Sequence, residues 1–203
     1  TTTGTDAITV TMAAASTAAA DLNTIDGKTS VAVGAAAITA LTGTAADIKL
    51  ALASSGITTV TNNSLAVNVN SGTASVADIN IINSDSATGI VTATATETAA
   101  ATLIGLTTTG TDAITVTMAA ASTAAADLNT IDGKTSVTVG ATAITELTGN
   151  ATDVKTALAS SGITTVTNGS LAVNVNSGTS SLSSTHTTYT EIARGIVTAT
   201  ATE

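Results

Sequence analysis

The chain of 203 residues contains no cysteine, proline, phenylalanine or tryptophan, and only one histidine, one tyrosine and one arginine. The absence of cysteine excludes disulfides and thiolate metal sites, and a single histidine cannot build a histidine-rich zinc site. Without large aromatic side chains, the core must be filled by valine, isoleucine, leucine and alanine, which give thin layers. No apolar run reaches the roughly 18 residues of a membrane span, so no membrane span is expected.

Charged residues are also scarce, at 9% of the chain against about 25% in an average globular protein. The net charge is -9, and the five basic residues form no cluster, which argues against nucleic acid as a partner. The hydrophobic content of 43% argues against disorder. No signal peptide follows Thr1, so we expect a soluble chain that is processed or excised from a longer one. A composition low in nitrogen and sulfur is typical of a protein exported in bulk, which favours an extracellular location.

The main signal is an internal duplication. Residues 1–31 recur without a change at 107–137, and the next 39 residues recur with eight substitutions. Most of these substitutions exchange a small residue for threonine, asparagine or glutamate, as a solvent-facing position tolerates. The sequence therefore divides into a first repeat unit, 1–106, and a second, incomplete one, 107–203, which carries a variant segment at 180–194.

Within each repeat unit, short alternating runs precede segments with helical spacing. The alternating apolar residues predict half-buried strands: Ile8, Val10 and Met12; Val31, Val33 and Ala35; Leu65, Val67 and Val69; Val91, Ala93 and Ala95. The segments that follow, such as "AAADLNTI" and "TAADIKLALASSG", predict short amphipathic helices with Thr or Ser as N-caps and Gly56 as a stop. Four such pairs per unit, joined by right-handed crossovers, predict an α/β solenoid, with repeated rungs of a short parallel strand plus a short helix.

Two tandem β-sandwich modules are the alternative fold. The period of 106 residues favours them, and so does Asn168-Gly169, a good hairpin turn between two strand-like runs. The alanine-rich helical segments count against this alternative.

The phrases "LTGTAADIKLALASSGI", "LTGNATDVKTALASSGI" and "AADLNTIDGKTSV" resemble Ala/Thr-rich tandem-repeat regions of very large bacterial, cyanobacterial-type cell-surface or secreted proteins. The resemblance covers nearly the whole chain except 180–194. It implies an extracellular structural role, as a filament, surface layer or adhesin stalk, and brings no catalytic residues with it. The nonapeptide pattern of calcium-binding repeats is missing, so calcium by that route is not supported.

Catalytic constellations are weak. His186 with Ser183, Ser184 and Glu191 offers the residue types of a hydrolase triad, but all lie within nine residues and no nucleophile elbow accompanies them. We therefore expect no enzymatic activity.

Aspartates recur at one point of successive rungs, immediately before a leucine, isoleucine or valine: Asp21, Asp47, Asp78, Asp127 and Asp153. Paired carboxylates can serve glycoside hydrolysis, but recurrence on every rung favours a structural role at the start of a helix. Asp6, Asp26 and Asp85 are expected in turns, as residues chosen for local hydrogen bonds. No cofactor is expected, although weak binding of calcium by a column of turn carboxylates is left open.

Threonine rows such as "TATATE" at Thr92 to Glu97 raise an ice-binding or polysaccharide-binding surface as the alternative function. An ice-binding surface orders water by means of the same threonine column on every rung. In this sequence that column is interrupted by Ala32, Gly34, Ala66 and Asn68. Threonine more often keeps an exposed strand soluble.

The positions at which the sequence starts and stops within the repeat predict that the chain assembles with further repeats. Neither end carries a polar capping rung, so we expect the chain to continue a longer array or to associate with itself by end-to-end stacking. In "STHTTYTEIAR", Ser184 to Arg194, threonines replace the isoleucines of the first repeat. We expect this variant loop to be an assembly contact, with four candidate residues: His186, Tyr189, Glu191 and Arg194.

Overall fold

The computed structural model describes residues 1–59, 64–85, 87–165, 171–180 and 197–201. The chain forms two compact units, which are Thr1–Thr96 with Thr111–Ile114, and Glu97–Gly110 with Thr115–Glu203. Their bounds differ from those of the sequence repeats, because residues 97–106 fall in unit 2 and residues 111–114 fall in unit 1.

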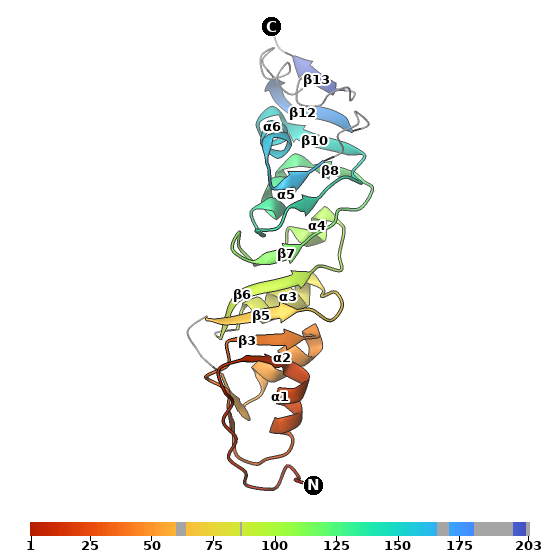
Figure 1. The fold of residues 1–203 in the computed structure, drawn as a ribbon. Helices are drawn as coiled ribbons and strands as arrows, with labels where there is room; N and C mark the ends of the chain where they lie inside the picture. The colour runs from red at the N-terminus through yellow and green to blue at the C-terminus, as the bar shows by residue number, and fades with distance from the viewer. Residues whose placement is uncertain (60–63, 86, 166–170, 181–196, 202–203) are drawn as a thin grey trace. The chain divides into compact units, whose positions relative to one another are not determined.

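Unit 1 alternates short strands and short helices along the chain (Figure 1). Its helices are α1 (Ala19–Asp26), α2 (Ala45–Ala53) and α3 (Val76–Asn83). Its strands are β1 (Ser16–Ala18), β2 (Val33–Gly34), β3 (Ala40–Gly43), β4 (Ile57–Thr58), β5 (Leu65–Val69), β6 (Thr88–Thr94) and the start of β7 (Ala113–Thr115).

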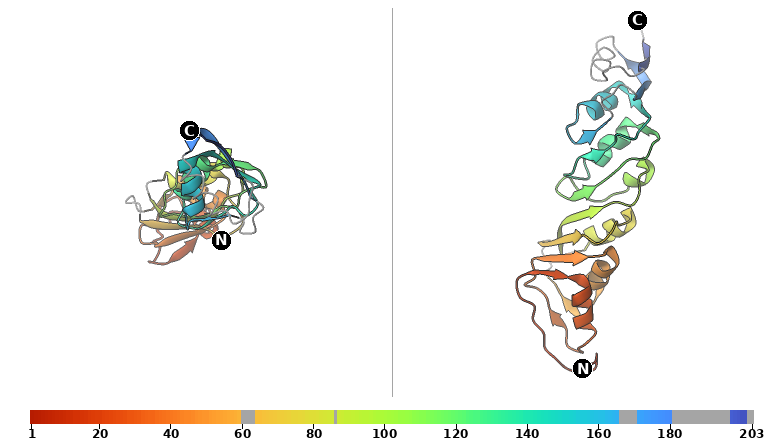
Figure 2. Two further views of the ribbon diagram at one scale, coloured as in Figure 1. Left: turned by 90° about the horizontal axis from the view of Figure 1, so that it is seen from above. Right: turned by 45° about the vertical axis from the view of Figure 1, so that its right-hand side comes forward.

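Most of these strands join one sheet in the order β1-β3-β5-β6-β7, while β2 and β4 pair separately. The pairs β1 with β3, β3 with β5, and β5 with β6 are parallel, as is β2 with β4. Each parallel connection must cross over to return the chain to the same end of the sheet. Helices α1, α2 and α3 lie in these crossovers, and α2 contacts both of the others (Figure 2).

Unit 2 repeats this arrangement. It contains α4 (Ala100–Leu103), α5 (Ala125–Asp132) and α6 (Ala151–Ala159). Its strands are β8 (Ser122–Ala124), β9 (Val139–Gly140), β10 (Glu146–Asn150), β11 (Ile163–Thr164), β12 (Ala172–Ser180) and β13 (Val197–Ala201). The main sheet has the order β13-β12-β10-β8, with parallel pairs, and β9 pairs with β11.

The prediction of a mixed α/β chain with parallel strands is confirmed. The alternative of tandem β-sandwich modules is wrong for the described residues, because the strand pairs are parallel and six helices alternate with them. Asn168-Gly169, which suggested a hairpin, lies outside the described residues.

Two of the predicted strands, β5 and β6, form inside the sheet, where another strand lies on each side. Leu65, Val67 and Val69 on β5 are at most 4% exposed, and Val91 and Ala93 on β6 are similarly buried. The strand expected around Val10 is wrong for the first repeat, where residues 8–12 make only one isolated bridge, from Thr11 to Gly34. The strands β1, β3 and β4 were not predicted, because their few residues show no alternation.

The predicted helices are confirmed for α1 and α2. Thr44 caps α2 and Ser75 caps α3, each by accepting the N–H of an aspartate three residues on, as Thr and Ser do at helix starts. α1 follows Ala18 without a side-chain cap, so that part of the prediction is wrong. The core consists of aliphatic side chains, the largest fully buried ones in unit 1 being Leu22, Leu41, Ile48, Leu65, Ile79, Ile82 and Ile114.

A polar bridge ties the end of one helix to the end of the next. The Ser54 hydroxyl donates to Asp26 Oδ2 at 2.8 Å and accepts the Gly56 N–H at 3.1 Å. In the second repeat, the Ser160 hydroxyl likewise donates to Asp132 Oδ2 at 2.8 Å. Asp26 was expected only in a local turn, but its partner lies 28 residues further along the chain.

This bridge leaves no space for a side chain at Gly56. A Cβ there would lie 2.1 Å from Asp26 Oδ1, so Gly56→Ala must displace the carboxylate from Ser54. We expect a loss of about 1–3 kcal/mol in the free energy of unfolding, measured by chemical denaturation followed by far-UV circular dichroism. Gly27→Ala is the control, because its Cβ would meet nothing closer than 3.6 Å. Equal stability of the two variants would contradict the prediction.

Candidate functional site

The predicted assembly contact cannot be placed in this structure. His186, Tyr189, Glu191 and Arg194 lie outside the described residues, as do Ser183 and Ser184 of the weak triad. That contact stays a prediction from the sequence.

The recurring aspartates lie in the first turns of five helices, as the sequence predicted: Asp21, Asp47, Asp78, Asp127 and Asp153. Around Asp47 the contacts are reciprocal. Its N–H donates to Thr44 Oγ1 at 3.1 Å, and the Thr44 hydroxyl donates back to Asp47 Oδ2 at 2.7 Å. The Thr44 hydroxyl thus satisfies a backbone N–H at the helix start, and the Asp47 carboxylate orients that hydroxyl and complements the helix dipole. Its role is structural.

A polar side chain two residues after the aspartate connects α1 to α2, α2 to α3, and α5 to α6. Asn23 donates to the Asp47 carbonyl at 3.0 Å, and Asn129 donates to the Asp153 carbonyl at 3.1 Å. On α2 the same position is Lys49, whose ammonium group pairs with the Asp78 carboxylate. These contacts span 24 to 29 residues, so local sequence patterns could not show them.

The ion pair perturbs one carboxyl group. The hydrogen bond from Lys49 lowers the pKa of Asp78, helped by the hydrogen bond from Ser75 and opposed by partial burial. Because the pKa of Asp78 is depressed in the folded state, the stabilisation is present above the ordinary aspartate pKa and is lost as the pH falls through the lowered value.

Lys49→Gln should therefore reduce stability at neutral pH by less than about 1 kcal/mol, since both partners are roughly a third exposed. The difference from the unmodified chain should shrink as the pH falls below the ordinary aspartate pKa and through the lowered pKa of Asp78. Thermal unfolding at a series of pH values measures this. Lys155→Gln is the matched control. Lys155 is the counterpart of Lys49 in the second repeat, and the counterpart of Asp78 there is the uncharged Ser184. A pH-independent difference at Lys49 would contradict the prediction.

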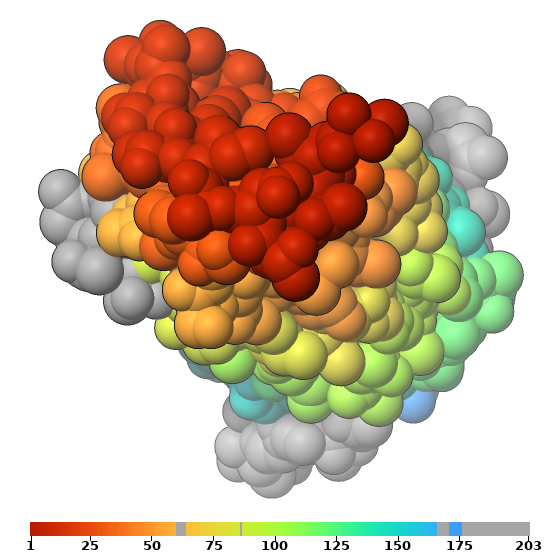
Figure 3. Space-filling view, turned by 90° about the horizontal axis from the view of Figure 1, so that it is seen from below, coloured from red at the N-terminus to blue at the C-terminus, as the bar shows by residue number. Residues whose placement is uncertain are grey.

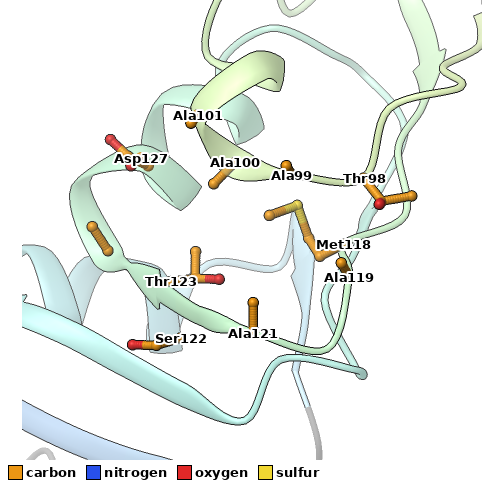
Figure 4. A pocket seen from close by; sticks show the side chains of 11 residues that line it. Thr98, Ala99, Ala100, Ala101, Met118, Ala119, Ala121, Ser122, Thr123 and Asp127 are labelled. Carbon is orange, nitrogen blue, oxygen red and sulfur yellow. The ribbon is translucent and has the colours of Figure 1, made fainter.

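One pocket of about 290 Å³ lies in unit 2 (Figure 4). Met118 projects into it toward Ala99 and Ala100, and Asp127 lies on the opposite side. Ala100 and Ala101 of the one-turn helix α4 line part of this pocket. Asp127 is the sole ionisable group among the described lining residues, which gives no pair of catalytic groups.

The surface near the N-terminus differs from its duplicate. Ile8 is 37% exposed, and Val10 and Met12 are half-buried. A hollow of about 300 Å³ beside Ile8 and Val10 is also lined by Thr2, Thr24, Ile25, Lys28 and Thr29. Figure 3 shows the first residues of the chain, in red, facing the viewer.

This N-terminal surface is held in place although it forms no regular strand. The Thr29 hydroxyl accepts the Ile8 N–H at 3.1 Å and donates to the Ile8 carbonyl at 2.7 Å. Thr29 itself is 8% exposed. The exposed isoleucine therefore belongs to a fixed backbone.

The equivalent residues of the second repeat are buried. Ile114, Val116 and Met118 are at most 2% exposed, although residues 107–137 are identical to 1–31. Sequence alone could not distinguish the two copies, because the difference comes entirely from what lies against each of them.

Asp6 and Asp112 show the same contrast. Asp112 is 4% exposed, and its Oδ1 accepts the Val91 N–H of β6 at 2.9 Å. Asp6 is exposed and accepts the Thr3 N–H at 2.7 Å in a local turn. One aspartate of the duplicated sequence thus contacts a neighbouring strand, and the other contacts its own segment.

Among the described strands of unit 1, threonine does not continue across the sheet at the position of Thr42. The strand register places Thr42 beside Asn68 and Asn68 beside Thr92, with Ala18 at the first position. Within the described ranges, no three histidine, aspartate or glutamate side chains come together as a metal site requires. None of the helices in those ranges is long and apolar enough to cross a membrane.

The chain was compared with protein-family models, with curated proteins and with solved structures, and none of these comparisons gives a match.

Proposed function

We propose that the chain is a structural repeat protein, whose strand and helix segments are the rungs of an α/β solenoid. Its rungs extend either into a longer array or, by end-to-end stacking, into a filament, a surface layer or an adhesin stalk. It acts through assembly and not through catalysis.

The contrast between Ile8 and Ile114 carries this proposal. One sequence occurs twice in the chain, once with an exposed apolar surface and once buried behind preceding segments. A repeat that buries its apolar face only when a neighbour is stacked on it is the defining behaviour of a solenoid. A surface of this kind favours association with a further rung.

The extracellular location rests on the composition and on the resemblance to bacterial cell-surface repeat regions. Few charges, no cysteine and many threonine, serine and asparagine residues suit a protein made in quantity for the outside of a cell. Self-association or continuation of the array is the proposed partner interaction.

Stacking can be tested by adding the segment that precedes the duplicate. A variant with a second copy of residues 64–106 placed before Thr1 supplies Ile8 with the neighbour that Ile114 has. We expect a higher midpoint of thermal unfolding, because additional apolar surface is buried. The control carries the same residues in scrambled order. An unchanged midpoint would remove the solenoid proposal.

Assembly is tested separately by negative-stain microscopy of the unmodified chain at neutral pH. Filaments or sheets are expected. Compact monodisperse particles would lead us to abandon self-assembly and keep only the longer array.

A further inference from the structure

The last described strand, β13, repeats the sequence of β6 in the sheet of unit 1. Residues 195–203 are identical to residues 89–97, and β13 pairs with β12 in the register that β6 has with β5. Val67 is opposite Val91, and Val173 is opposite Val197. The two strands therefore present the same backbone groups and the same sequence at their other edge.

In unit 1 that other edge is occupied. β7 lies beside β6 in the sheet, and just before β7 the Asp112 carboxylate accepts the Val91 N–H. Ile114 on β7 is fully buried. Among the described strands, β13 is the end member of its sheet, and Val197 corresponds to Val91.

The residues that would complete this edge occur elsewhere in the same chain. Asp6, Ala7, Ile8 and Thr9 are identical to residues 112–115. Asp6 and Ile8 are exposed, with the carboxylate held only by its own turn. The sequences of both halves of the β6–β7 contact thus occur a second time in the chain, at β13 and at residues 6–9.

We propose that residues 6–9 of one copy bind the outer edge of β13 of a second copy, as residues 112–115 bind β6. The Asp6 carboxylate leaves Thr3 and accepts the Val197 N–H of the second copy, and Ile8 becomes buried. This inference rests on the proposed function and names its partner: a second copy of the chain, joined head to tail. Because the two surfaces differ, the contact is heterologous, and its repetition gives a filament where the rotation between copies does not close a ring.

A second copy is the favoured partner because its β13 has the same sequence as β6, the strand whose Val91 N–H donates to Asp112 in unit 1. Addition of a strand to an open sheet edge also satisfies backbone groups that would otherwise be unpaired. The buried hydrogen bond from an N–H to a carboxylate fixes the register.

Sedimentation velocity over a concentration series tests the contact in the full chain. Asp6→Ala should weaken association at least about tenfold, the effect of losing one charge-assisted hydrogen bond. Ile8→Glu should abolish association, because it places a charge in the buried interface. Asp21→Ala is the control, since it removes the same charge from an exposed helix position and should leave association unchanged.

The outcomes separate the two proposals. If the unmodified chain associates and both Asp6→Ala and Ile8→Glu associate equally well, this contact is overturned, but stacking through another surface stands. If the unmodified chain stays monomeric at every concentration, the second copy is overturned as the occupant, and the variant carrying residues 64–106 before Thr1 decides the solenoid independently. Unchanged circular dichroism and melting of the monomeric variants exclude misfolding as the cause of lost association.

Discussion

Ile114→Ala should lower the free energy of unfolding by about 2–5 kcal/mol, the range for truncating a fully buried isoleucine, whereas Ile8→Ala should lower it by less than about 1 kcal/mol. Ile114 is 0% exposed and Ile8 is 37% exposed. The truncation leaves a cavity only where neighbours surround the side chain. Chemical denaturation followed by far-UV circular dichroism measures both, since the chain has no tryptophan.

This pair of variants is closely matched. The two isoleucines lie at the same position of identical 31-residue segments, so local effects in the unfolded state cancel. The measurement must be made at concentrations where the chain is monomeric, because association would bury Ile8 as well. Equal losses at the two positions would show that the N-terminal surface is covered in solution, against the structure.

The same duplication shows where sequence reasoning succeeds. Leu65, Val67 and Val69 alternate, and they form β5 with a parallel neighbour on each side. The aspartates before an apolar residue were expected at helix starts, and Asp47 lies there because Thr44 and Asp47 satisfy each other locally. Both features depend on residues a few positions apart, which a single sequence displays.

It also shows where such reasoning fails. The alternation of Ile8, Val10 and Met12 predicted a strand, yet a strand forms only at β7, where the identical residues lie beside β6. Strand formation here depends on the neighbour and not on the alternating residues themselves. The contacts of Asp26 with Ser54 and of Asp112 with Val91 join residues 21 to 28 positions apart. No local sequence pattern shows the packing of strands and helices that brings these residues together.

The double variant Ile79→Thr, Ile82→Thr should lower the free energy of unfolding by about 4 kcal/mol, roughly 2 kcal/mol at each site. Both side chains are 0% exposed on α3. Each change removes buried hydrocarbon and places a hydroxyl in an apolar site. Part of that penalty is offset, because a helical threonine can donate to the carbonyl four residues earlier, as Thr24 does to Ala20 at 2.8 Å.

Ile81→Thr is the internal control for this variant. Ile81 lies on the same helix but is 54% exposed, so we expect a change within about 0.5 kcal/mol. All three substitutions occur naturally in the second repeat, where Thr185, Thr187 and Thr188 stand at these positions. If only the buried pair causes a large loss of stability, the threonine-containing sequence of residues 182–189 cannot replace the core contacts of α3. That is the condition for the variant segment 180–194 to serve as a contact surface. A double variant as stable as Ile81→Thr would remove this argument, and the variant segment would then be an ordinary part of the repeat.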